Sequence, residues 1–208
     1  MRHLFHDRSG SSAAEFAIVL PLLMIFLFGI IDAGRWIWTY NRAEKATQMG
    51  VRMATVTDPI SPGIASSFLG VSGLTQGDVI PASAFGKVTC TGSGSGASVT
   101  ATCTCTTTPC PSLGTASNTA FQTVLTRMRE FLPELTASNV AIVYSTSGLG
   151  YAGDPNEHDL SPMVTVIIGS PATRVQFRPI TAFLIAQLNM PTFTATLTGE
   201  DLTGAQSN

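Results

Sequence analysis

The spacing of hydrophobic positions divides this chain into a long helical part and a mixed part. The run from Phe16 to Ile31 contains no charged residue and, with the residues just before it, approaches the ~20 residues that a helix needs to cross a bilayer. Beyond it, apolar and small residues continue at three- and four-residue spacing among charged ones. We therefore predict one helix from about Ser12 to about Val56, ended by Pro59, which cannot continue it.

Shorter periodic runs follow this helix. Residues 58–86 are rich in Pro, Gly and Ser, which predicts a loop-dominated link with a short helix around residues 64–69. Two β-branched runs, 87–91 and 97–106, flank a Gly/Ser tip and predict a hairpin. Further on, the patterns predict a helix over 116–132, strands over 140–144 and 164–168, a short helix over 183–188 and a final strand over 193–198. The expected fold class is α+β, with an antiparallel sheet and one or two packed helices.

Composition and charge limit the possible partners. Only 12% of the residues are charged, the net charge is −2 and the pI is about 5.8, which argues against nucleic acid as a partner. The charges are distributed unevenly. Six basic residues oppose four acidic ones up to Thr57, whereas five oppose nine in the rest of the chain.

Flanking charges predict the direction of the anchor. Arg2 and Arg8 precede the apolar run, so the positive-inside rule predicts a cytoplasmic N-terminus and an exported C-terminal part. Arg35 follows the run, but Asp32 lies three residues before it and offsets its charge on the same helix face. A single-pass membrane protein with an exported head is the expected arrangement. The predicted parts are a leader over 1–10, a transmembrane and stem helix over 11–57 and a head over 58–208.

Two further features concern the membrane boundary. Trp36, Trp38 and Tyr40 are aromatic residues of the kind that settle at a membrane interface. A secretory signal peptide would need small residues at the −3 and −1 positions of its cleavage site. The nearest such site, Asp32-Ala33-Gly34, begins with an acid, so the apolar run reads as an anchor.

Small residues recur along the predicted helix at four-residue spacing, which lets another structural element approach closely. They form two rows: Gly29 and Ala33 near the apolar run, and Ala46, Gly50 and Ala54 further along. Such rows either pack on a second helix or cover the protein's own head, and the sequence leaves both alternatives open.

All four cysteines, Cys90, Cys103, Cys105 and Cys110, fall within the predicted hairpin region 86–110. An exported compartment and an even count predict two disulfides. Cys103 and Cys105 share one face of a strand and are poorly placed to bond each other, so Cys90 is expected to pair with one of them and Cys110 with the other. A zinc site is the rival, but the Cys-x-Cys spacing departs from the usual two-to-four-residue gap.

Glu15 is a carboxylate at the mouth of the apolar run. A charge at mid-membrane depth costs roughly 2–3 kcal/mol, and less near the interface. The simplest interpretation is that Glu15 forms an ion pair with a cation. The α-amino group created by cutting the chain after Gly10 is one candidate. The other interpretation is an acid that snorkels to the interface in an uncleaved anchor.

Several separated motifs occur in the first quarter of the chain. They are Gly10 followed by four residues and Glu15-Phe16-Ala17, then Leu20-Pro21-Leu22, residues 29–35 and residues 46–54. In this order they resemble the TadE-like pseudopilins of the tight-adherence (Flp) pilus system, and residues 163–168 and Phe177-Arg178-Pro179-Ile180 in the C-terminal part resemble the same family. The chain departs from the type IV pilin pattern because Ser11 replaces an aromatic residue or Met after the predicted cut, as in the tight-adherence variant. The resemblance implies a location in the bacterial inner membrane, with the head in the periplasm or outside the cell.

The resemblance implies a pilin-like fold and a specific processing step. A membrane prepilin peptidase would cut between Gly10 and Ser11. Glu15 would then pair with the N-terminal amine of a neighbouring subunit. The implied partners are this peptidase, other pilins or pseudopilins, the inner-membrane pilus assembly platform and membrane lipid.

The sequence therefore predicts a minor pilin or pseudopilin that acts structurally in pilus assembly or priming. The alternative is an uncleaved, membrane-anchored accessory protein or adhesin of the same system. No motif supports an enzyme, a cofactor or a metal site. The loop Asp154–Asp159 begins like a calcium loop, but it has His158 at the fifth position and no Gly at the sixth, so it reads as a turn and leaves calcium binding open.

Overall fold

The computed structural model describes residues 9–96, 98–155, 158–169, 171–183, 186–199 and 202. These residues form two compact units. The anchor unit consists of the described residues of Met1–Thr39 and Gln176–Leu188. The head unit consists of those of Tyr40–Val175 and Asn189–Asn208. Each unit is described separately below.

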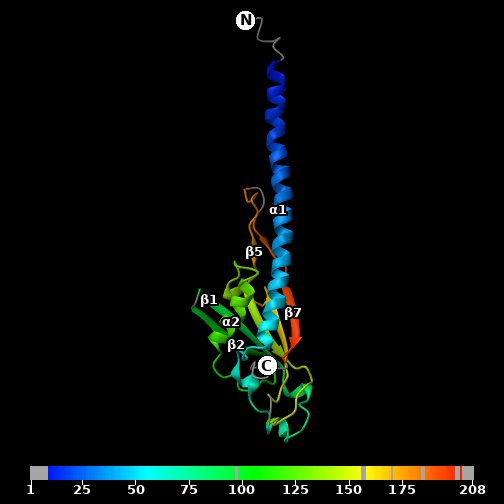
Figure 1. The fold of residues 1–208 in the computed structure, drawn as a ribbon, viewed down its shortest axis with the longest axis vertical. Helices are drawn as coiled ribbons and strands as arrows, with labels where there is room; N and C mark the ends of the chain where they lie inside the picture. Colours follow the sequence, from blue (N-terminus) through cyan, green and yellow to red (C-terminus); the bar gives the residue numbers. More distant parts are fainter. Residues whose placement is uncertain are drawn as a thin grey trace. The chain divides into compact units, whose positions relative to one another are not determined.

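A single helix, α1, runs from Ser9 to Thr55 and supplies both units (Figure 1). It contains 47 residues and continues without interruption through Pro21. Among the described residues, α1 is the one helix long and apolar enough to cross a membrane. Its large apolar side chains from Phe16 to Ile31 are exposed, apart from the half-buried Phe28. The long helix predicted from the sequence is confirmed.

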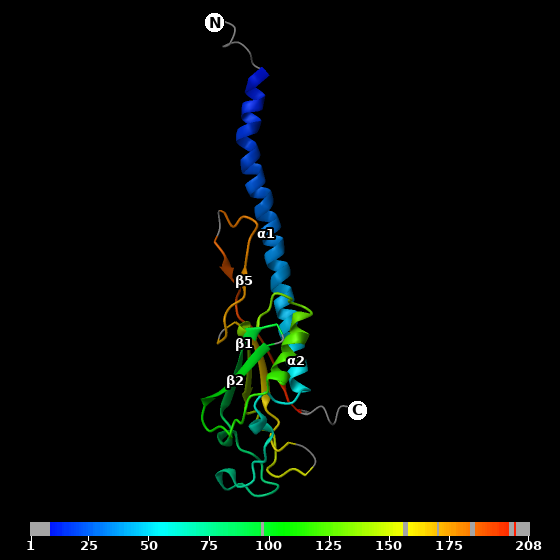
Figure 2. The same ribbon diagram turned by 90° about the vertical axis from the view of Figure 1, so that its left-hand side faces the viewer.

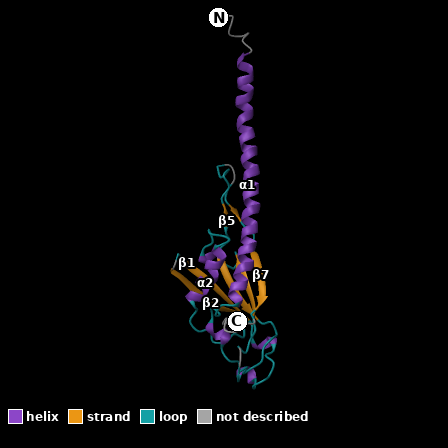
Figure 3. Cartoon of the chain, in the orientation of Figure 1, coloured by secondary structure: helices purple, strands orange, loops and turns teal. Residues whose placement is uncertain are grey.

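In the head unit, five strands form an antiparallel sheet in the order β2-β1-β3-β4-β7 (Figure 3). The hairpin β1–β2, the central pair β3–β4 and the edge strand β7 match the predicted strands. The bounds are β1 Lys87–Ser95, β2 Ser98–Thr107, β3 Val140–Ser145, β4 Met163–Ile168 and β7 Phe193–Thr198.

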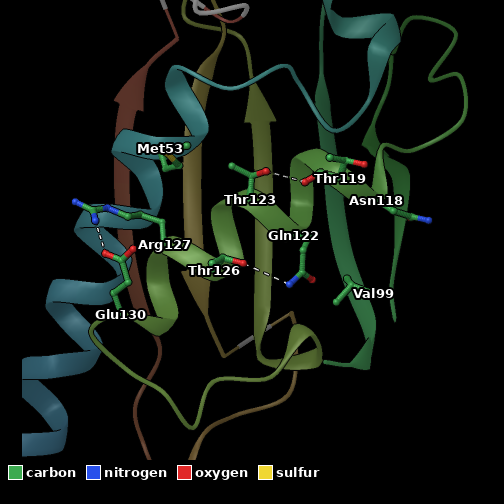
Figure 4. A pocket seen from close by; sticks show the side chains of 9 residues that line it. All are labelled: Met53, Val99, Asn118, Thr119, Gln122, Thr123, Thr126, Arg127 and Glu130. Atoms are coloured by element: carbon green, nitrogen blue, oxygen red, sulfur yellow. Dashed lines mark hydrogen bonds and ion pairs between the residues drawn. The ribbon is translucent and has the colours of Figure 1, made fainter. Parts of the chain in front are cut away.

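One face of the sheet forms the core of the head. The strand registers place Cys90 opposite Ile142 and Ile142 opposite Val166, and all three side chains are fully buried. Helix α2 (Asn118–Arg129) and the C-terminal part of α1 lie over this face (Figure 4). A Cβ at Gly92 of β1 would lie 2.4 Å from Phe121 of α2, so a glycine is required where the helix meets the strand.

The opposite face is more open and carries threonines. Thr89 bonds Thr106 at 3.0 Å between β1 and β2, and Thr165 bonds Thr196 at 2.9 Å between β4 and β7. The threonines of the hairpin therefore serve strand pairing on a half-exposed sheet, as their β propensity predicts.

Two polar contacts fasten the long loops to the head. The buried hydroxyl of Tyr144 accepts a hydrogen bond from the amide of Ile60, and burial raises the pKa of Tyr144 to about 12. The carboxylate of Asp159 accepts bonds from the amides of Phe68 (2.6 Å), Gly153 (2.8 Å) and Asp154 (3.1 Å). Burial of Asp159 acts to raise its pKa, but these donors outweigh burial and hold the pKa below its usual value.

The last carboxylate of the loop Asp154–Asp159 thus binds the amide of Asp154 and the segment before the loop, and its interpretation as a turn stays a prediction. Asn156 and Glu157 lie outside the described residues.

The link over 58–86 contains three short 3₁₀ helices, Pro62–Ala65, Val71–Gly73 and Ala82–Ala84. One of them overlaps the short helix expected around residues 64–69.

The predicted helix over 183–188 is wrong for the residues that the structure describes. Phe183 lies in a turn, and Leu188 begins strand β6 (Leu188–Asn189), which pairs with β5 (Gln176–Phe177). This segment is rich in apolar residues without a clear period, a pattern that fits either a helix or a loop. The pairing of β5 with β6 makes the segment between them a hairpin-like loop.

We expect Gly50 of α1 to be intolerant of a side chain. A Cβ there would lie 2.7 Å from Cγ and Sδ of Met128, which is fully buried and would have to shift. Gly50→Ala should therefore destabilise the head by about 1–3 kcal/mol, as overpacking does. Thermal unfolding of the detergent-solubilised chain measures this loss.

Gly34→Ala is the matched control, because Gly34 lies on the same helix with no atom within 4 Å of an added Cβ. It should keep or slightly raise the stability. The double variant Gly50→Ala with Met128→Ala should be less destabilised than the sum of the single variants. Strict additivity of the two losses would contradict the proposed contact.

Candidate functional site

The predicted cleavage site lies at the start of α1. Residues 1–8 of the predicted leader are outside the described residues, and the structure describes only the backbone of Gly10 and Ser11, which is helical. Cleavage between these two residues stays a prediction. The helix continues directly from this point into the apolar run, with no turn between them.

Glu15 lies on the second turn of α1 with its side chain exposed. Glu15 takes part in none of the ion pairs among the described residues. Those pairs join Asp32 to Arg35, Arg42 to Glu134 and Arg127 to Glu130. Within the described part of the chain, the carboxylate therefore projects from an apolar helix without a cation beside it. A cation from another molecule would meet it without displacing an existing contact.

The two rows of small residues have different surroundings. Ala46, Gly50 and Ala54 are buried in the head unit, where Gly50 faces Met128 of α2. This row covers the chain's own head and is closed to a helix from another molecule. Gly29 and Ala33 in the anchor unit are exposed, and nothing lies within 4 Å of a Cβ built on Gly29.

The cysteines form the two disulfides Cys90–Cys103 and Cys105–Cys110. This is one of the two pairings that the sequence leaves open. The first bond joins residues that face each other directly in the β1–β2 register, and the second closes the chain just after β2. Both bonds lie in the hairpin, so they stabilise the edge of the sheet.

A hollow in the head unit lies against α2 (Figure 4). Its charged side chains, Arg127 and Glu130, pair with each other on the helix, and the amide of Gln122 donates to Thr126 at 3.4 Å. This lining offers no nucleophile beside a base, so we assign no chemistry to it. The lining residues are Met53, Val99, Asn118, Thr119, Gln122, Thr123, Thr126, Arg127 and Glu130.

The most highly coordinated polar group of the anchor unit is the carboxylate of Asp32, directly after the apolar run. Asp32 is 7% exposed. Its Oδ1 accepts from the amide of Ile180 at 2.7 Å, and its Oδ2 accepts from the amide and hydroxyl of Thr181 at 2.9 and 2.8 Å. One side chain of α1 thus fixes a turn that is 148 residues away in sequence.

Arg35 and Trp36 complete this attachment one turn further along α1. Arg35 pairs with Asp32 at 3.0 Å, and its guanidinium carbon lies 5.4 Å from the ring centre of Phe177. Trp36 packs edge-on against the same ring, with centroids 5.3 Å apart. We call the residues Asp32, Arg35, Trp36 and 177–181 the Asp32 clamp. It combines a buried carboxylate, a cation–π contact and an aromatic pair.

The sequence predicted the Asp32–Arg35 pair but not the clamp. The segment 177–180 was noted only for its resemblance to the family, and no local pattern indicates that the amides of Ile180 and Thr181 bind Asp32.

The predicted aromatic cluster is divided between the two units. Trp36 faces Phe177 in the anchor unit, Trp38 is exposed, and Tyr40 packs on Phe193 in the head unit. Of the three, Trp38 alone has the exposure expected of an interface residue.

We expect Asp32→Asn to release the segment 180–181 while leaving α1 helical. The variant keeps the size of the side chain but replaces one acceptor oxygen with an amide that faces the donors Ile180 and Thr181. Hydrogen exchange at these two amides should become about tenfold faster or more. Mass spectrometry of peptides covering 177–183 measures the change.

Asp78→Asn is the matched control, because Asp78 also accepts from a backbone amide and a hydroxyl, both of Thr75, at 2.7 Å. It should alter exchange only near Thr75. Unchanged exchange at Ile180 and Thr181 in Asp32→Asn would contradict the role assigned to the clamp.

Residues 10–52 match the family model described as TadE-like protein. No curated protein and no solved structure matches the chain. The matched residues begin at the predicted cleavage site and include Glu15, both rows of small residues up to Gly50, and Asp32 and Arg35 of the clamp. By this match, residues 10–52 of the chain are similar to the TadE-like protein family.

Proposed function

We propose that this chain is a minor pilin or pseudopilin of a tight-adherence pilus system, with a structural and not an enzymatic role. A prepilin peptidase cuts it between Gly10 and Ser11. The apolar part of α1 anchors the chain in the bacterial inner membrane, with the N-terminus in the cytoplasm and the head exported. Assembly then brings α1 beside the helices of other pilins at the assembly platform.

The exposed carboxylate of Glu15 carries this proposal. It projects from a helix whose neighbouring side chains are apolar and exposed, and it has no cation beside it in the described part of the chain. Moving such a charge into lipid is unfavourable unless a cation accompanies it. The α-amino group of a neighbouring subunit, created by the cut, is a cation at the corresponding depth.

Other observations support the same proposal. The family match covers the helix from Gly10 onward. Gly29 and Ala33 leave an exposed row on which a second helix can approach closely, whereas the row at Gly50 is occupied by the head. The two disulfides suit an oxidising compartment outside the cytoplasm.

Cleavage is expected to produce a chain that begins at Ser11. Intact-mass spectrometry of the protein purified from membranes should show this form, and the chain from cells without the peptidase should begin at Met1. Gly10→Val should block the cut because the added side chain obstructs the scissile bond, whereas Gly34→Val should be cut normally. An intact leader in cells with active peptidase would support the uncleaved accessory protein instead.

Glu15→Gln should impair assembly and spare insertion. The substitution keeps the shape of the side chain and removes its charge, so entry into the membrane becomes easier while the proposed ion pair is lost. We expect recovery of the chain with sheared filaments, or with cross-linked pilin partners, to fall by about tenfold or more, the equivalent of losing ~1.4 kcal/mol or more.

Glu44→Gln provides the control for this variant, since Glu44 is an exposed glutamate on the same helix. It should leave recovery unchanged. Normal assembly of Glu15→Gln would exclude the ion pair as the contact that sets the position of the subunit. Both variants should remain in the membrane fraction after alkaline extraction.

A further inference from the structure

The loop held by the Asp32 clamp has an apolar and exposed tip. Phe183 is 71% exposed and Ile180 is 48% exposed, and Leu188 is also exposed where the loop returns. No charged residue occurs from Pro179 to Gly199. Single exposed apolar residues are ordinary on protein surfaces, but a concentration of large ones on one uncharged loop marks an interaction surface. We call Ile180, Thr181, Ala182 and Phe183 the loop tip.

The clamp fixes where this tip lies. Asp32 is the first residue after the uncharged run of α1, and it binds the amides of Ile180 and Thr181. Figures 1 and 2 both show the loop beside α1, with its turn directed toward the N-terminal end of the helix. The tip therefore lies beside the boundary between the apolar run and the rest of α1, within the same compact unit.

We infer that the loop tip is a second membrane contact, which enters the lipid headgroup region beside α1. This inference rests on the proposed membrane anchor and does not depend on pilus assembly. The apolar run of α1 places the hydrocarbon layer directly adjacent to Asp32, and Phe183 follows the Asp32-bound Thr181 by two residues. Its exposed ring therefore meets lipid and not bulk water. Withdrawing this apolar surface from water is favourable.

Three other features match a lipid surface. At the base of the tip, Arg35 donates to the carbonyl of Arg178, and both arginines are exposed, which suits the phosphates of the headgroups. Trp38, on the adjacent turn of α1, is 67% exposed, as expected of an interfacial aromatic residue. The amides of Ile180 and Thr181 are already bonded to Asp32, so entry of the tip into the interface leaves fewer backbone donors without partners.

The backbone also limits the depth of the tip. A turn exposed to lipid cannot enter the hydrocarbon core because its unpaired backbone groups would lose their water. The loop is thus an interfacial wedge and not a second span. Together, α1 and the wedge hold the membrane-proximal part of the chain at two points, which restricts rotation of the anchor unit about the axis of the helix.

The test measures the depth of three nitroxide labels in the full chain. The variants are Phe183→Cys at the loop tip, Ile25→Cys in the apolar run and Leu149→Cys on the head, each in the oxidised protein, whose described cysteines are all in disulfides. All three sites are exposed, so labelling should not disturb the fold. The chain is reconstituted into vesicles of phosphatidylcholine and phosphatidylglycerol, and collisions with oxygen and with a water-soluble nickel chelate report depth.

We expect the Ile25 label to lie in the hydrocarbon, the Phe183 label in the interface and the Leu149 label in water. A Phe183 label as accessible to nickel as the Leu149 label, with Ile25 in lipid, would overturn the wedge and leave the anchor intact. A Phe183 label shielded from both reagents only at high protein-to-lipid ratios would also overturn it, in favour of a second copy of the chain. An Ile25 label in water would overturn both the anchor and the wedge.

As a second check, Asp32→Asn should move the Phe183 label toward water while leaving the Ile25 label in lipid. The clamp is the contact that holds the tip at its depth, so releasing it should raise nickel accessibility at Phe183 by at least about threefold. An unchanged Phe183 label in this variant would overturn the positioning of the tip by the clamp.

Discussion

The exposed apolar surface of the first half of α1 sets the conditions that the other groups of the chain must meet. Apart from the half-buried Phe28, its large side chains from Phe16 to Ile31 are exposed. A helix that is apolar on all sides is stable only where lipid or other apolar helices surround it. Two carboxylates lie at the ends of this surface: Glu15 at one end of the run and Asp32 at the other.

Each of these two carboxylates places a negative charge beside an apolar helix, and the two charges are compensated differently. Asp32 is compensated within the chain, by two amides, a hydroxyl and Arg35. It is a structural group that holds a remote loop against the helix. Glu15 has no such compensation among the described residues, which fits a contact completed by another molecule. Although both are acids at the edges of an apolar run, their surroundings separate the fixing role of Asp32 from the assembly role that we propose for Glu15.

Most of the elements were predictable because their signals are local. The length of α1, the hairpin β1–β2, helix α2 and the central strands follow from residue spacing, β-branched runs and the prolines at helix ends. The segment 183–188 was misread because apolar density without a clear period does not distinguish a helix from a loop. The clamp was not predictable at all, since it joins groups 148 residues apart.

The long apolar helix, the position of Glu15 within it and the antiparallel class of the sheet all follow from residue types at short and regular intervals, so they can be predicted without coordinates. Which small residues are free to contact another molecule depends on packing between distant segments. Ala46, Gly50 and Ala54 have the same spacing as Gly29 and Ala33, yet the head buries the first row and the second remains exposed. The spacing of small residues identifies the face of a helix that another segment can approach closely. It does not tell which segment packs there, because that depends on contacts between residues far apart in the sequence.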